Sequence, residues 1–144
     1  MSASPRLQTL SDILRRSAQR LPGKTAVICG DTRWTYAEFD ALVSRLAAGM
    51  ARHGVAQGTR VAVLARNSHG FAAMRFALAR LGAVLVPINF MLKADEVAYI
   101  LRHAGAPFLA TDTDLAPLAR EAALRDTAVE SFIWLPSEES SAPA

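Results

Sequence analysis

Short apolar runs alternate with helix-periodic segments along most of this chain, and this alternation is the feature that most constrains its fold. Four runs have the length and β-branching of buried strands, at residues 60–65, 83–88, 107–112 and 131–135. Between them, apolar residues recur at steps of three and four, as on one face of a helix. Strands and helices in this order predict βαβ units with right-handed crossovers. We therefore expect an α/β fold with a mostly parallel sheet and helices on both faces.

Local signals predict where the helices begin and end. Thr9 with Asp12, and Thr35 with Glu38, have the spacing of capping boxes at the starts of two apolar-periodic segments. A short hairpin, with strands at 25–30 and 33–36, is expected between these two helices. Further helices are expected after residue 68, after residue 93 and over 114–124. Glycines follow three of the periodic segments and are expected to end those helices, at Gly54, Gly82 and Gly105.

The strand expected at 83–88 is apolar on both sides, which is typical of a strand buried between two layers of helices. Pro87 cannot donate a hydrogen bond to a neighbouring strand, so it is expected at the end of the strand. Asn89 then begins the following loop. From this pattern we expect the strand to occupy a central place in the sheet.

Composition and charge argue against several classes of protein. The net charge is +3 over 144 residues, but the arginines are scattered over different helices rather than interleaved with aromatic residues. No nucleic-acid partner is therefore expected. No apolar run reaches the roughly 18 residues of a membrane span, and the first ten residues lack the apolar core of a signal peptide. The single cysteine, Cys29, is expected to be a buried thiol in "TAVICG". We expect a cytoplasmic location.

The most suggestive local match is "PGKT" at residues 22–25, whose Gly-Lys-Thr matches the last three residues of the phosphate-binding P-loop motif. Ala18 stands where the first glycine of that motif belongs. A P-loop follows a strand and opens a helix, whereas this segment follows an expected helix and opens an expected strand. We interpret it as a turn that ends a helix. No G-x-G-x-x-G dinucleotide motif is present.

No catalytic or metal-binding residue is predicted from the remaining candidates. The three histidines are far apart in sequence and each is expected near a helix end, at His53, His69 and His103. Ser68 is interpreted as a helix cap, since no G-x-S-x-G motif surrounds it. Two pairs of carboxylates lie near expected helix N-termini, where a negative charge interacts favourably with the helix dipole. The pairs are Asp95 with Glu96, and Asp112 with Asp114. Asp112 also follows a strand, as a phospho-acceptor aspartate does, but the other residues of a receiver domain are not evident in the right order.

Two long strings resemble the adenylate-forming enzymes, which include acyl-CoA synthetases, aryl-CoA ligases and luciferases. The first string is "WTYAEFDALVSRLAAGMARHGVAQGTRVAVLARNS", with an aromatic-Thr-Tyr-x-Glu start, a helix and a strand ending near Asn-Ser. The second is "ARLGAVLVPINFMLKADEVAYILRHAGAPFLATD", with Gly-Ala, a buried strand, Pro-x-Asn and a following helix. The resemblance runs from about Leu10 to Asp112. The segment "PINFML" resembles the corresponding segment of the acyl-CoA and aryl-CoA ligases more than that of peptide-synthetase domains.

The resemblance implies a parent enzyme that joins a carboxylic acid to ATP and then passes the acyl group to coenzyme A, with the help of Mg²⁺. In that family the phosphate loop, the adenine-binding motifs and the catalytic lysine follow later in the chain, so no catalytic residue is carried over. No cofactor is expected to bind this chain alone. Asn67 and Asn89, at the ends of neighbouring strands, are the two residues expected next to a substrate pocket. A role in forming turns is the alternative for both.

Three interpretations follow. In the first, residues 1–135 are the N-terminal α/β portion of an AMP-binding synthetase domain, as a fragment of an acyl-CoA synthetase of fatty acid metabolism. Residues 136–144 are then a polar tail or truncated loop. In the second, the chain is a non-catalytic interaction module that pairs with a separately encoded remainder. In the third, it is an unrelated small α/β binding domain. Whether this chain is itself an enzyme stays open, because it lacks the phosphate loop and the lysine.

Overall fold

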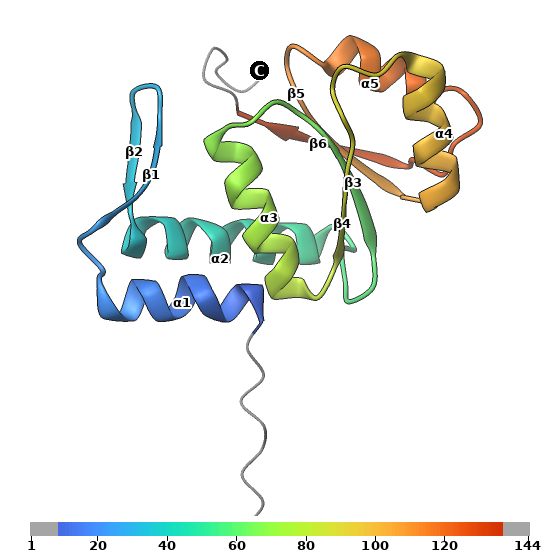
Figure 1. Cartoon of the computed structure of the whole chain (residues 1–144). Coiled ribbons are helices and arrows are strands. Elements are labelled where there is room, and N and C mark those ends of the chain that lie inside the picture. Colours follow the sequence, from blue (N-terminus) through green and yellow to red (C-terminus); the bar gives the residue numbers. More distant parts are fainter. Residues whose placement is uncertain (1–8, 137–144) are drawn as a thin grey trace, which may run out of the picture.

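The computed structural model describes residues 9–136, which form an α/β arrangement of five helices and six strands among the residues described (Figure 1). The chain begins with a helix and a hairpin and then alternates helix and strand. The elements are α1 (Leu10–Arg20), β1 (Thr25–Cys29), β2 (Thr32–Thr35), α2 (Tyr36–Arg52), β3 (Arg60–Leu64), α3 (His69–Leu81), β4 (Val84–Pro87), α4 (Ala94–Ala104), β5 (Phe108–Asp112), α5 (Ala116–Ala123) and β6 (Ser131–Leu135).

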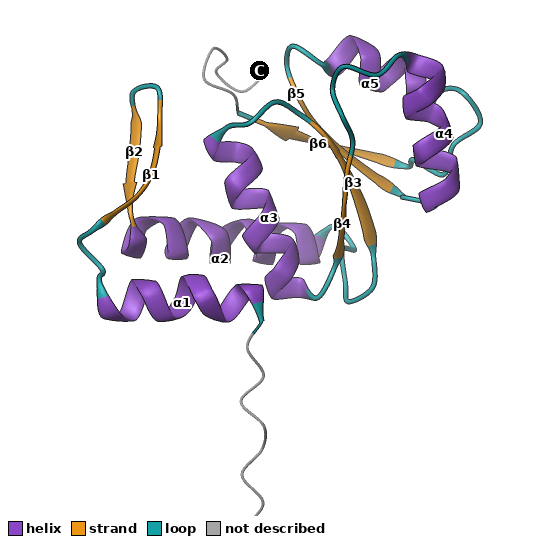
Figure 2. Cartoon of the chain, viewed as in Figure 1, coloured by secondary structure: helices purple, strands orange, loops and turns teal. Residues whose placement is uncertain are grey.

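Four strands form one parallel sheet in the order β4-β3-β5-β6. Helices α1, α2 and α3 lie on one side of it and helices α4 and α5 on the other (Figure 2). Successive residues of β3 point to opposite sides, as the pleat of a strand requires. Val61 and Val63 join the apolar cluster under α2 and α3, while Ala62 and Leu64 join the cluster under α4 and α5. The expected fold, a parallel sheet with helices on both faces, is confirmed.

Strands β1 and β2 form a separate antiparallel hairpin that stands beside α2 and α3 (Figure 1). Trp34 of β2 fastens the hairpin to the helices, because its ring stacks on Phe39 of α2 with centroids 5.8 Å apart. Phe39 in turn meets Phe76 of α3 edge-on at 5.7 Å. Aromatic pairs of this kind bury large apolar areas in preferred geometries. The hairpin is thereby held near the start of α3.

Most of the expected helix boundaries are confirmed. Both capping boxes are formed. The Thr9 hydroxyl accepts a hydrogen bond from the Asp12 N–H. The Thr35 hydroxyl accepts from the Glu38 N–H, and the Glu38 carboxylate accepts from the Thr35 N–H. Gly82 ends α3 in the left-handed conformation, at φ 66°, where a side chain would be strained. Helix α5 is shorter than the expected 114–124, since Asp114 and Leu115 precede its first turn.

The expectation for strand 83–88 is wrong in one respect. Strand β4 lies at an edge of the four-stranded sheet and is not a central element. Val84 is 43% exposed, and Pro87, which cannot donate to a neighbour, suits an edge. The strand at the centre is β3, which pairs with both β4 and β5. None of the helices among residues 9–136 is long and apolar enough to cross a membrane. Of the expected tail, all but Pro136 lies outside the described residues.

Candidate functional site

The loops that follow β3, β4 and β5 meet at the carboxyl edge of the sheet, where ligands bind in many parallel α/β proteins. Asn67 and Asn89 lie in two of these loops and both are exposed. Asn67 borders two shallow hollows beside α3, of about 330 and 370 Å³. The Asn89 side chain accepts a hydrogen bond from the Met91 N–H at 2.9 Å, which forms a turn. For Asn89 the geometry agrees with the turn-forming alternative, while a place beside a substrate pocket stays a prediction for both residues.

Asp112 is the most constrained polar side chain of this edge. It ends β5 and is only 1% exposed. One carboxyl oxygen accepts from the Leu115 N–H at 2.9 Å, and the other accepts from the Arg66 N–H at 2.9 Å. The first bond caps the turn into α5, while the second ties the loop after β5 to the loop after β3. Both oxygens are engaged by the chain's own backbone, so Asp112 has a structural role here.

The Arg66 side chain lies across the same edge. Its guanidinium is 3.7 Å from the Asp114 carboxylate and 5.8 Å from the centre of the Phe90 ring. Three loops, those after β3, β4 and β5, are therefore bridged by one residue. Both members of the ion pair are partly exposed, so the pair itself adds little stability. Asp112 and Arg66 therefore link the loops of the carboxyl edge to one another.

The start of α3 contacts the end of β6. The Ser68 hydroxyl accepts from the Phe71 N–H at 3.2 Å, as a helix cap, and lies 3.3 Å from the Pro136 carbonyl oxygen, to which it donates. Gly70 has no room for a side chain: a Cβ atom would lie 2.6 Å from that same carbonyl oxygen. The expected capping role of Ser68 is confirmed. The residue also holds the chain where it leaves the sheet.

His69, the first residue of α3, is buried rather than at the surface. Its ring meets Trp34 edge-on with centroids 5.3 Å apart. Among the described residues, its Nδ1 is the buried side-chain polar atom with no hydrogen-bond partner. Burial lowers the pKa of His69 from its ordinary value, because the charged imidazolium would lose its hydration. A positive charge at the N-terminus of a helix is also unfavourable. The site between the hairpin and α3 thus favours the neutral form of His69.

We expect the stability of the chain to fall as the pH falls below about 6.5, the ordinary pKa of histidine. The unfolded chain takes up a proton on His69 there, while the folded chain resists it until its lowered pKa is reached. The contribution is complete above pH 6.5 and is lost on acidification towards that lowered pKa. Urea unfolding at a series of pH values, compared with His69→Gln, measures it. The substitution should flatten the profile between pH 7 and 5. A profile identical in both proteins would contradict this prediction.

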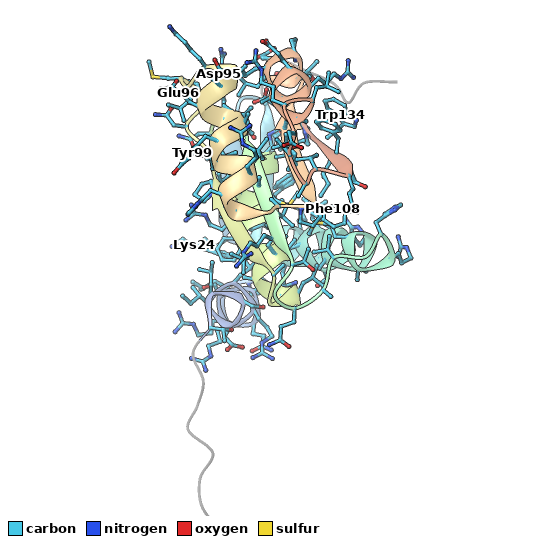
Figure 3. All side chains as sticks on the ribbon, turned by 90° about the vertical axis from the view of Figure 1, so that its right-hand side faces the viewer. Lys24, Asp95, Glu96, Tyr99, Phe108 and Trp134 are labelled. Atoms are coloured by element: carbon cyan, nitrogen blue, oxygen red, sulfur yellow. The ribbon has the colours of Figure 1, made fainter. Side chains whose placement is uncertain are left out.

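The other candidates from the sequence do not come together. His53 caps the end of α2 and His103 lies in the last turn of α4, as expected near helix ends. Residues 22–24 form the turn between α1 and β1, and Thr25 begins β1, so this segment follows a helix and opens a strand as expected. Asp95 and Glu96 are exposed in the first turn of α4 (Figure 3), where Glu96 accepts from the Lys93 N–H at 2.8 Å. Residues 9–136 hold no group of side chains that could bind a metal ion.

Two features of the structure differ from, or could not be predicted by, the sequence analysis. The expected burial of the Cys29 thiol is only partly met, since the residue is half-buried beside the hollow that borders Asn67. The bridge from Asp112 to the Arg66 N–H, 46 residues away, has no local signal at all. The sequence placed Asp112 only near a helix N-terminus or in the position of a phospho-acceptor, and neither interpretation indicates a bond to the loop after β3.

Comparison with known proteins agrees with this architecture. Residues 14–143 match the family described as AMP-binding enzyme. The chain is 34% identical over 117 residues to the fatty acid–[acyl-carrier-protein] ligase ScoC of Streptomyces coeruleorubidus, covering 81% of this chain and 22% of ScoC. It is 36% identical over 123 residues to the peroxisomal benzoate–CoA ligase of Arabidopsis thaliana, covering 85% of this chain and 21% of that enzyme.

A solved structure with the same arrangement is the N-terminal domain of FACL13 from Mycobacterium tuberculosis. The TM-score is 0.83 at 34% identity, and the match covers 89% of this chain and 34% of that domain. The geometry defines the class of protein as a parallel α/β scaffold whose carboxyl-edge loops are linked by its own side chains. The chain belongs to the family of AMP-binding enzymes. It spans about a fifth of the length of the curated relatives it matches.

Proposed function

We propose that this chain is the scaffold-forming N-terminal part of an acyl-CoA synthetase and has no catalytic activity by itself. The observation that carries the proposal is the family match over residues 14–143, together with a carboxyl edge whose polar groups bond to one another. Asp112 and Ser68 are occupied by backbone groups and Arg66 by neighbouring loops. In this proposal residues 1–135 form one unit, which holds loops in place for a site built by other polypeptide.

For the parent enzyme we propose a carboxylic acid substrate, activated by ATP and Mg²⁺ and then transferred to coenzyme A. This chemistry is supported by the family and by the names of relatives, among which ScoC is named for an acyl-carrier protein as acceptor instead. Residues 9–136 offer neither a phosphate loop nor a group of carboxylates that would fit Mg²⁺. ATP, Mg²⁺ and coenzyme A would therefore be held by residues beyond those described. A cytoplasmic location remains a prediction from the sequence alone.

We expect the isolated chain to give no ATP–pyrophosphate exchange with butyrate, benzoate or palmitate. The physical reason is that residues 9–136 hold neither a phosphate loop nor a group of carboxylates for Mg²⁺. The complementary measurement uses full-length M. tuberculosis FACL13 in which the region matching this chain is replaced by residues 10–136. That hybrid should support exchange above the background of the isolated chain. Exchange by the isolated chain, or a well-folded hybrid without exchange, would contradict the proposal.

A further inference from the structure

The β1–β2 hairpin is joined to the rest of the chain at its base and through one of its faces. At the base, the Tyr36 N–H donates to the Lys24 carbonyl at 2.9 Å. The two strands pair with each other in a sheet of their own, which stands apart from the four-stranded sheet (Figure 1). Within β1 and β2, both of which the structure describes in full, no residue is fully buried. A two-stranded hairpin is only marginally stable by itself, so its position depends on what its inner face contacts.

Trp34 and Cys29 lie on the hairpin face that meets the start of α3. Trp34 pairs with Val27 in the strand register, and Cys29 lies two residues further along β1, so the three side chains share a face. The opposite face carries Ile28, which is 62% exposed. The Trp34 ring meets the His69 ring edge-on at 5.3 Å, and Cys29 and His69 line one shallow hollow of about 370 Å³. The His69 ring is therefore part of the contact between the hairpin and α3.

The surroundings of His69 do not compensate a proton on its ring. The residue is 8% exposed, and its Nδ1 has no hydrogen-bond partner among the residues described. Of the described side chains that line the hollow, only Cys29 is titratable besides His69. Strand β2 contributes the Trp34 ring, the end of β6 contributes Pro136 through its bond to Ser68, and the first turn of α3 holds no acidic residue. An imidazolium here would lack hydration and a counter-charge, and it would face the positive end of the helix dipole.

We propose that the β1–β2 hairpin is released from α3 when the His69 ring gains a proton, so that mild acid opens this part of the chain while the four-stranded sheet stays folded. Release lets water reach the imidazolium. It breaks no strand pair of the four-stranded sheet, and the base of the hairpin stays joined to the start of α2. Elements with little buried surface commonly open ahead of the whole protein. Burial is the cause of the lowered pKa of His69, so in the released form this pKa returns towards its ordinary value of 6.5.

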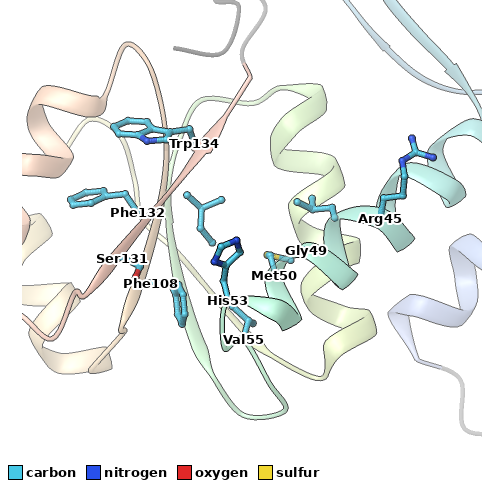
Figure 4. A pocket seen from close by; sticks show the side chains of 11 residues that line it. Arg45, Gly49, Met50, His53, Val55, Phe108, Ser131, Phe132 and Trp134 are labelled. Carbon is cyan, nitrogen blue, oxygen red and sulfur yellow. The ribbon is translucent and has the colours of Figure 1, made fainter. Parts of the chain in front are cut away.

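His53 offers a matched control within the same chain. It is exposed at the end of α2, beside a second hollow of about 590 Å³ between α2 and the strands β5 and β6 (Figure 4). It does not line the hollow between the hairpin and α3. A positive charge is also favourable at the C-terminal end of a helix. Replacing His53 by glutamine should therefore leave the response of the hairpin to pH unchanged.

Hydrogen exchange of single amides, followed by NMR, tests the proposal, because it reports where the chain opens while urea unfolding reports the whole chain. Each rate is divided by the rate of an unstructured peptide at the same pH. From pH 7.5 to 5, we expect the opening of β1 and β2 to rise about threefold or more, since the released form takes up a proton that the closed form resists. At pH 5 this opening should depend weakly on added urea, because it exposes little surface, while the opening of β3 should depend on it steeply.

Two variants that cannot take up this proton complete the test. His69→Phe keeps a ring against Trp34, and His69→Gln keeps a polar side chain, so if one of them fails to fold the other supplies the comparison. In either variant the opening of the hairpin should stay constant between pH 7.5 and 5, whereas His53→Gln should behave as the parent does.

Three results would overturn the proposal. A hairpin whose opening is the same at pH 7.5 and pH 5 in the parent is not released by acid. A rise that persists in the His69 variants belongs to another titrating group. If the opening of β1 and β2 has the same steep dependence on urea as that of β3, the hairpin opens only when the whole chain unfolds.

Discussion

Replacing Asp112 by alanine should lower the free energy of unfolding by about 2–4 kcal/mol, because the Leu115 N–H loses its acceptor in a buried place and the Arg66 N–H loses its acceptor in a partly buried one. A fully buried donor left unsatisfied costs roughly 1–3 kcal/mol, and a partly buried one costs less because water can reach it. The loss compares with a total stability of about 5–15 kcal/mol for a domain of ordinary size. The loops after β3 and β5 should separate as well, since the carboxylate is what links the Arg66 N–H to the turn at Leu115.

Urea unfolding followed by circular dichroism measures this effect. Asp114→Ala is the matched control, since Asp114 is two residues away but partly exposed, and its ion pair with Arg66 is long at 3.7 Å. It should change the free energy of unfolding by less than about 0.5 kcal/mol. Asp112→Asn should fall between the two, because its single amide oxygen can satisfy one N–H. If the alanine variants of Asp112 and Asp114 were equally stable, the structural role of Asp112 would be refuted.

The sequence predicts the elements well where their signals are local. Thr35 and Glu38 lie three residues apart, so their capping box can be recognised without any knowledge of the fold. Gly82 and Gly105 follow their helices directly and adopt the positive φ that favours glycine. The place of β4 is different. Its apolar pattern indicates burial, but strand order depends on which crossovers the helices make. Pro87 suits an edge strand and equally the last residue of a central one, so it does not decide between one neighbour and two.

The candidate site shows the same division. The bond from the Leu115 N–H to Asp112 spans three residues and follows from the position of an acidic residue before a helix. The bond from the Arg66 N–H to the same carboxylate spans 46 residues and requires β3 and β5 to be neighbours. His69 is similar, since it was expected near a helix end but its burial depends on Trp34, which a distant hairpin brings to it. A contact that forms only when two distant segments become neighbours cannot be predicted from the sequence of either segment alone.

Gly70→Ala should destabilise the chain by about 1–2 kcal/mol, although the same substitution usually stabilises a helix. The new Cβ atom would lie 2.6 Å from the Pro136 carbonyl oxygen and 3.0 Å from the Pro136 ring, so the end of β6 must shift. Overpacking of this kind costs about 1–3 kcal/mol, against a gain in helix propensity of about 1 kcal/mol. The shift would also stretch the hydrogen bond from Ser68 to Pro136.

Gly49→Ala provides the matched control, because it makes the same change in a helix where a Cβ atom meets only the end of the Arg52 side chain. In the isolated chain this variant should gain up to about 1 kcal/mol from helix propensity. In urea unfolding, the free energy of unfolding should therefore fall below that of the parent for Gly70→Ala and rise above it for Gly49→Ala. Hydrogen exchange adds a local measurement, since Gly70→Ala should speed exchange in β6 while leaving β3 protected. Equal stabilisation by both variants would mean that Pro136 yields without cost, and that the start of α3 does not hold the end of β6.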